Sequence, residues 1–163
     1  MPLAGQLIRA SDSRAVDYAS QASNVTLSTT AGVYSDVVVG NVFTPVANRR
    51  YLCTFYGGDQ MLVAGSGFAT TDAWRIKFQV SVAGGAYADL VPGNGYLARC
   101  YVAASTRYII APSISDYLAG SIATLQFKVQ AAKSSGAGTV TSTLETGTGA
   151  APFTLLVEDV GEI

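Results

Sequence analysis

Side chains able to do chemistry are few in this chain, and they are scattered. None of the 163 residues is a histidine, and the two cysteines, Cys53 and Cys100, lie far apart. Without histidine, the Ser-His-Asp and Cys-His systems that activate a nucleophile cannot be built. Two distant thiols also fall short of the ligand set of a structural zinc site. The sequence therefore predicts neither of these kinds of catalysis and no metal site.

Acid–base chemistry by carboxylates is the route that remains, with eleven Asp and Glu residues available. Most of them lie beside Gly, Ser, Thr or Ala in predicted turns, where a carboxylate hydrogen-bonds the nearby backbone. Glu158 and Asp159 are neighbours, and neighbouring side chains of a strand point to opposite faces. They cannot form the facing pair that glycoside hydrolysis needs. We expect a protein that is not an enzyme and binds no cofactor.

Composition points instead toward association. Charged residues make up 13% of the chain, against about 25% in an average soluble domain, and the mean hydropathy is +0.31. A surface this short of charge tends to associate, and identical copies are the commonest partners. The net charge of −1 is spread without a basic patch, so nucleic-acid binding is not expected. Arg49-Arg50, the one adjacent basic pair, is interpreted as a solvated strand start.

Membrane insertion is not expected either, since no apolar run approaches the roughly 18 to 20 residues of a spanning helix. The opening residues, Met1 to Gly5, lack a basic region followed by an apolar stretch, so no secretory signal is predicted. The expected place of folding is a cytoplasm.

Alternation with a period of two residues is the strongest structural signal. One face of a predicted strand carries Trp74, Ile76, Phe78, Val80 and Val82. A second predicted strand has the alternating apolar positions 123, 125, 127, 129 and 131. A helix, with its repeat of 3.6 residues, would scatter both sets around its circumference. Further strands are expected at 24–29, 33–46, 50–56, 60–64, 86–91, 96–103, 106–111, 138–145 and 152–159.

About ten short strands without an amphipathic helix predict an all-β fold, a jelly-roll-like antiparallel β-sandwich. Gly84-Gly85 are expected as the two central residues of a primed hairpin turn. Val37 to Val39 and Tyr51 to Cys53 are apolar on both faces, so a neighbouring subunit should cover one face. We divide the chain into an extended N-terminal arm, residues 1–20, and a sandwich domain, residues 21–163.

The cysteines and tyrosines within the predicted strands each allow more than one role. Cys53 and Cys100 are expected as apolar core residues, with a disulfide or a reactive thiol as the alternatives. The tyrosines of alternating strands suit a core or an oligomer interface, because Tyr combines a large contact area with a polar tip. Stacking against a carbohydrate is the alternative for them. The residues assigned to the oligomer interface are Tyr51, Tyr56, Tyr101 and Tyr108.

Three stretches of the chain also resemble a known group of proteins. Residues 1–12 (MPLAGQLIRASD), 43–51 (FTPVANRRY) and 153–161 (FTLLVEDVG) are similar to small structural proteins of tailed phages that infect actinobacteria. These are capsid-decoration or minor-tail proteins, some of them jelly-roll trimers of the complement C1q and tumour-necrosis-factor type. The resemblance implies a homotrimer, located in the virion, that has no catalytic residues.

A capsid decoration protein on the outer surface of the head is the function we expect, with the major capsid protein or another virion protein as partner. The arm would lie on that partner, and three arms on one trimer would bind far more tightly than one. The arm residues assigned to this contact are Leu3, Leu7, Ile8, Arg9, Asp12 and Arg14. The alternatives are a minor tail, baseplate or fibre-tip protein that contacts the host, and a carbohydrate-binding module.

Overall fold

The computed structural model describes residues 14–56, 61–64, 73–90, 96–99, 107–109, 113–135, 142–145 and 152–162. Within these ranges every regular element is a strand, and no helix long and apolar enough to cross a membrane is present. The strands are β1 (Arg14–Gln21), β2 (Val25–Leu27), β3 (Ser35–Val39), β4 (Arg49–Tyr56), β5 (Met61–Ala64), β6 (Ala73–Val82), β7 (Ala88–Asp89), β8 (Tyr96–Arg99), β9 (Arg107–Ile109), β10 (Ser113–Ala119), β11 (Leu125–Ser135), β12 (Ser142–Glu145) and β13 (Phe153–Glu162).

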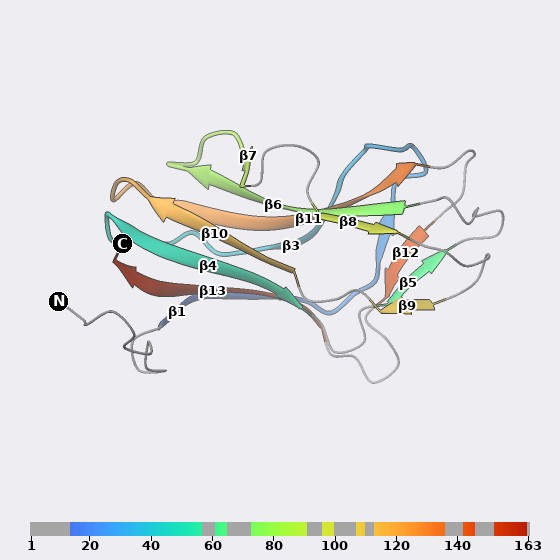
Figure 1. Ribbon diagram of the computed structural model, residues 1–163, viewed down its shortest axis with the longest axis horizontal. Helices are drawn as coiled ribbons and strands as arrows, with labels where there is room; N and C mark the ends of the chain where they lie inside the picture. The colour runs from blue at the N-terminus through green and yellow to red at the C-terminus, as the bar shows by residue number, and fades with distance from the viewer. Residues whose placement is uncertain are drawn as a thin grey trace.

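Two antiparallel sheets form the sandwich, as the alternation predicts. The first, here called the β4 sheet, has the strand order β1-β13-β4-β10, and the second, the β6 sheet, has the order β3-β11-β6-β7 with β8 also paired to β6 (Figure 1). A third sheet of short strands, β2-β12-β5-β9, lies at one end, on the right in Figure 1. The fold is therefore all-β and jelly-roll-like, which confirms the predicted class.

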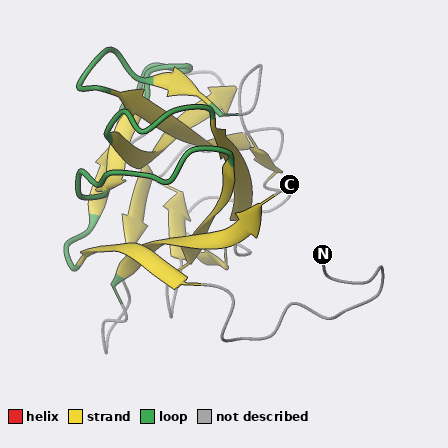
Figure 2. Ribbon diagram, turned by 90° about the vertical axis from the view of Figure 1, so that its left-hand side faces the viewer, coloured by secondary structure: helices red, strands yellow, loops and turns green. Residues whose placement is uncertain are grey.

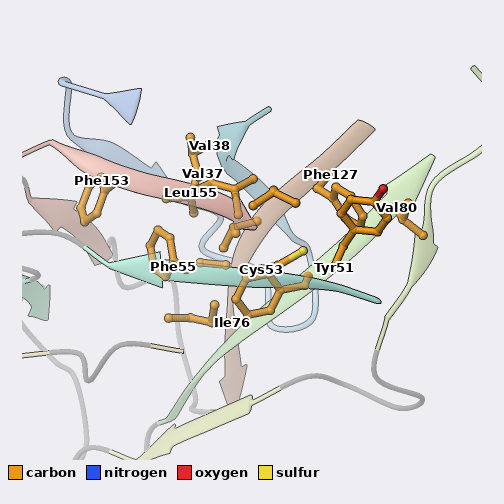
Figure 3. Close-up of a cluster of buried hydrophobic side chains, with 14 of the residues drawn as sticks. Val37, Val38, Tyr51, Cys53, Phe55, Ile76, Val80, Phe127, Phe153 and Leu155 are labelled. Carbon is orange, nitrogen blue, oxygen red and sulfur yellow. The ribbon is translucent and has the colours of Figure 1, made fainter. Parts of the chain in front are cut away.

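The core lies between the two large sheets. Strand β4 contributes Tyr51, Cys53 and Phe55, and β11 contributes Phe127 and Val129, all almost fully buried (Figure 3). Phe127 meets the rings of Phe43 and Tyr117 at centroid distances of 6.0 and 5.7 Å. The predicted inward faces of β6 and β11 are confirmed at Ile76, Phe78 and Val80 and at the odd positions 125 to 131, which are all buried. The prediction is wrong for Val82, which is 40% exposed at the end of β6, and the side chain of Trp74 is outside the described residues.

Strand β1 corrects the expected boundary of the arm. Residues 14–20 were assigned to it, yet Arg14–Gln21 pair antiparallel with β13 from Asp159 to Phe153. A register shift between Ala15 and Asp17 breaks the alternation there, and Asp17 points inward. Its carboxylate accepts hydrogen bonds from the backbone and side-chain N–H groups of Asn41, each at 2.9 Å. Residues 14–20 therefore belong to the sandwich, and the rest of the proposed arm lies outside the described residues.

Strand β10 is a second element that the alternation did not predict. Its apolar residues Ile114 and Leu118 are exposed, while Ser115 is buried opposite Cys53 of β4. Ser115 faces inward because the register with β4 pairs it with the buried Cys53, so Ile114 and Leu118 lie on the outer face.

The hairpin between β6 and β7 differs by one residue from its prediction. The N–H of Gly85 donates to the carbonyl oxygen of Val82 at 2.9 Å, so the central residues are Ala83 and Gly84. Both have positive φ, 52° and 70°, as a primed turn requires. Strand β3 is also shorter than the predicted 33–46, although Phe43 still forms an isolated bridge to Leu125.

Candidate interaction surface

The outer face of the β6 sheet carries charged side chains that pair among themselves. Lys128 lies 2.9 Å from the carboxylate of Asp36, which also accepts a hydrogen bond of 2.6 Å from Gln130. Burial alone would raise the pKa of Asp36, but hydrogen bonds from Lys128 and Gln130 and the charge of Lys128 outweigh it and lower that pKa. The carboxylate is thus held ionised by its neighbours.

A similar group lies farther along the same face. Lys77 is 3.1 Å from Asp89, and the side chain of Gln79 donates to the same carboxylate oxygen at 2.6 Å. The ammonium groups of Lys77 and Lys128 also lie over the rings of Tyr34 and Tyr87, at 4.1 and 4.2 Å from the centroids. Burial raises the pKa of both tyrosines, so their rings stay neutral beneath the lysines. These groups satisfy one another, and the two lysines are largely covered, with side chains 14% and 12% exposed.

The outer face of the β4 sheet is different in kind. Strand register places Tyr18, Leu156, Thr54 and Ile114 side by side, one from each of its four strands. Tyr18 and Ile114 are 56% and 50% exposed, and the two residues between them are partly buried. This apolar row crosses the whole sheet, so no strand interrupts it with a charge.

The neighbouring rows extend the apolar surface and add a few charges. One row contains Leu52 of β4 between Glu158 and Asp116, and the next in that direction pairs Arg50 with Leu118, which is 51% exposed. On the other side of the apolar row, Tyr56 is paired with Thr154. The "β4 face" below means this outer surface: Tyr18, Leu52, Thr54, Tyr56, Ile114, Leu118 and Leu156, with Arg50, Asp116 and Glu158. The apolar-on-both-faces prediction for residues 51–53 is confirmed by the inward Tyr51 and Cys53 and the outward Leu52.

The two adjacent arginines at the start of β4 have separate environments. Arg49 donates from Nε to both carboxylate oxygens of Asp159, at 2.8 and 2.7 Å, and is three-quarters buried. Arg50 lies 3.7 Å from Asp116 in an exposed pair. The solvated interpretation therefore fits Arg50 and is wrong for Arg49, whose partner is 110 residues away in sequence. Glu158 and Asp159 do point to opposite faces, as predicted.

Only one of the four tyrosines assigned to an oligomer interface has a side chain described at the surface. Tyr56, 37% exposed, lies on the β4 face. Tyr51 is corrected to a core residue: it is 1% exposed, and its hydroxyl accepts the backbone N–H of Val46 at 2.8 Å. Tyr101 is outside the described residues, and Tyr108 is described only as part of the backbone of β9.

The assigned arm residues are similarly divided. Leu3, Leu7, Ile8, Arg9 and Asp12 lie outside the described residues, while Arg14 is the first residue of β1. The residues that sequence reasoning missed are Tyr18, Ile114 and Leu118 on the β4 face. An exposed apolar residue gives no signal in an alternation that assumes apolar side chains point inward, so only strand pairing reveals them.

Elsewhere in the described residues, the side chains that could react or bind a metal have structural roles. Cys53 is a free thiol with no exposed surface, and burial raises its pKa far above the ordinary value, with the charges of Asp17 and Asp116 adding to the effect. A neutral buried thiol is a poor nucleophile. Cys100 is outside the described ranges. Within those ranges, no three Cys, Asp or Glu side chains are grouped as metal ligands.

Two shallow hollows lie among the residues that the structure describes. One lies beside Val42, Ala83 and Leu125 and has a volume of about 220 Å³. The other, about 250 Å³, lies between β1 and β3. Both are smaller than the ~300 to 1,000 Å³ typical of ligand pockets.

Comparison with known proteins finds no match to a family model and none to a curated protein. Similar solved structures come from infectious bursal disease virus. The Gt strain gives a TM-score of 0.39 at 10% identity, the VP2 subviral particle 0.39 at 11%, and the Gx strain 0.38 at 12%. They cover 99%, 98% and 91% of this chain, which spans 40%, 41% and 37% of theirs.

Proposed function

We propose that this chain is a non-enzymatic structural protein of a virion that self-associates, as a homotrimer, through the β4 face. The observation that carries the proposal is the apolar row of Tyr18, Leu156, Thr54 and Ile114 across all four strands of one sheet. The opposite outer face pairs its charges internally, so the two surfaces of one sandwich differ in what they can bind.

Energetics favour burial of the β4 face. Ile114, Leu118 and Tyr18 are each about half exposed, and covering such side chains contributes about 1 kcal/mol or more apiece. Arg50, Asp116 and Glu158 lie among them, so the face carries both charge signs, and a charge on one copy can meet an opposite charge on its neighbour. In a homotrimer each copy contacts its two neighbours head to tail, so different parts of the β4 face would meet at each contact.

Within a virion, the role that suits such an oligomer best is decoration of the head, with the major capsid protein of a tailed phage as partner. The low charge of the chain and the three stretches similar to actinophage structural proteins support this role. Residues 1–13, with Leu3, Leu7, Ile8, Arg9 and Asp12, would supply contacts to the shell. A tail location would use the same oligomer at a smaller number of sites.

Oligomer formation is tested by Ile114→Lys, which places a charge at the β10 end of the apolar row, where the side chain is 50% exposed. The matched control is Val39→Lys, because Val39 is also an exposed strand residue, 43% exposed, but belongs to the β6 sheet. Light scattering after size exclusion should show a trimer for the parent chain and for V39K, and a folded monomer for I114K. A monomeric parent chain, or equal behaviour of the two variants, would contradict the proposal.

The virion assignment has a separate test, which is the number of copies of this chain in purified particles, measured by quantitative mass spectrometry. Hundreds of copies per particle support decoration of the head. Three to a few dozen copies support a tail component, and absence from particles overturns the virion role.

A further inference from the structure

One end of the sandwich exposes aliphatic side chains at an unusual density. Figure 2 looks onto this end, with loops facing the viewer. Five large aliphatic residues located here are between 40% and 70% exposed: Val42, Val46, Val82, Leu118 and Ile122. We call this surface the apolar end. Val42 and Val46 come from the loop after β3, Val82 from the end of β6, and Leu118 and Ile122 from the end of β10 and the loop after it, so the surface is assembled from three parts of the chain.

Backbone hydrogen bonds hold these loops to one another. Phe43 and Leu125 exchange bonds of 2.9 and 2.8 Å, the N–H of Asn48 donates to the carbonyl oxygen of Ala119 at 2.7 Å, and the N–H of Ala83 donates to that of Thr124 at 2.8 Å. The exposed aliphatic residues therefore stand on a preformed surface. A shallow hollow beside Val42, Ala83 and Leu125 lies within this surface.

Charge is missing from all three loops. Residues 40–48, 82–88 and 119–124 contain no Lys, Arg, Asp or Glu. Exposed loops are ordinarily polar, and an uncharged surface with five exposed aliphatic residues favours an uncharged, apolar partner. The occupant should therefore have the same character.

The chain itself supplies a segment of that character at the right place. Arg14, the first described residue, pairs with Asp159 near the end of β13, and β13 pairs there with the start of β4, which follows the loop 40–48. Arg14 therefore lies at the apolar end, and residues 1–13 precede it in the chain. The first eight of them, Met-Pro-Leu-Ala-Gly-Gln-Leu-Ile, carry no charged side chain.

The segment of residues 1–13 is long enough to reach the apolar end. Thirteen extended residues span up to about 43 Å, whereas the three strand spacings from β1 to β10 amount to about 14 Å. A segment joined directly to its binding surface also has an effective concentration of about millimolar, far above that of free copies in dilute solution. The same chain is therefore the favoured source.

We propose that residues 1–8 of the same chain cover the apolar end, with Leu3, Leu7 and Ile8 packed against Val42, Val46 and Ile122. The segment screens in the free protein a surface that would otherwise associate without specificity. This inference does not rest on the virion role, because it concerns the isolated chain.

Trypsin cleavage after Arg9 in the full chain, followed by mass spectrometry, tests the contact. Packing of residues 1–8 should protect this bond, and either Ile122→Ser or Leu7→Ser should accelerate cleavage by about tenfold, the change expected from losing one buried aliphatic side chain. Val33→Ser, at a 48% exposed position next to Gly32, which bonds Lys133 near the other end of β11, should leave the rate unaltered.

Dilution identifies the source of the segment. Protection that is independent of protein concentration supports the same chain, and protection that disappears on dilution overturns this proposal in favour of a neighbouring copy. Equal cleavage rates in the parent chain, I122S and L7S would overturn it altogether. Neither result bears on the oligomer test of Ile114→Lys, so the two proposals fail separately.

Discussion

The ion pair between Arg49 and Asp159 joins the start of β4 to the end of β13 and allows a quantitative test of the fold. Asp159 is 8% exposed and accepts both bonds from the Nε of Arg49, together with the N–H of Gly161 at 3.0 Å. Gly161 has φ 112° at the register shift in β13, so the carboxylate also holds the irregular backbone in place. Asp159→Asn keeps the shape of the side chain and removes its charge.

The expected loss of stability in D159N follows from how deeply Arg49 and Asp159 are buried. Removing one partner of a fully buried pair costs about 3 to 5 kcal/mol, because the other charge is left without compensation. Here the side chains of Arg49 and Asp159 are 26% and 12% exposed, so water can partly solvate the remaining guanidinium. We therefore expect D159N to lower the free energy of unfolding by about 2 to 3 kcal/mol.

Urea unfolding followed by circular dichroism, at one fixed protein concentration, measures this loss. The matched control is Arg50→Met, whose partner Asp116 lies 3.7 Å away with both side chains about half exposed or more, and the expected change is below about 0.5 kcal/mol. A double-mutant cycle with R49M and D159N should give a coupling free energy of about 1.5 kcal/mol or more. A D159N variant no less stable than R50M would refute the reasoning.

Two further predictions concern the core and the β6 sheet. Phe78 is 1% exposed, so Phe78→Asp buries an unpaired charge and should yield no soluble β-rich protein. Val82, on the same strand, is 40% exposed, so Val82→Asp should fold. Circular dichroism of the soluble fractions distinguishes the two outcomes. Because the pKa of Asp36 is lower in the folded chain, its contribution to stability is present above the unfolded pKa, near 4, and is lost as pH falls through the folded pKa. Between neutral pH and about pH 3 the parent chain should therefore lose more stability than D36N. The difference should be less than about 1 kcal/mol, because the carboxylate of Asp36 is half exposed. Equal losses in urea titrations would contradict the lowered pKa of Asp36.

Local sequence determined the class of fold because alternation is a property of the single strand. The pattern around Ile76, Phe78 and Val80 distinguishes the two faces of β6, and that around Phe127 and Val129 does so for β11, before any partner strand is known. The absence of histidine likewise limits the chemistry of the whole chain without reference to its structure.

Tertiary structure alone decided which faces are left for partners. Tyr51 and Tyr56 lie in the same strand, yet one is a core residue and the other belongs to the β4 face. Ile114 and Leu118 lie outward because the register of β10 with β4 pairs them with the outward Thr54 and Arg50, and Arg49 meets Asp159 across 110 residues. Pairing of β1 with β13 joins segments from the two ends of the sequence. Alternation separates two faces of a strand, but only the arrangement of strands decides which face meets the second sheet and which remains at the surface.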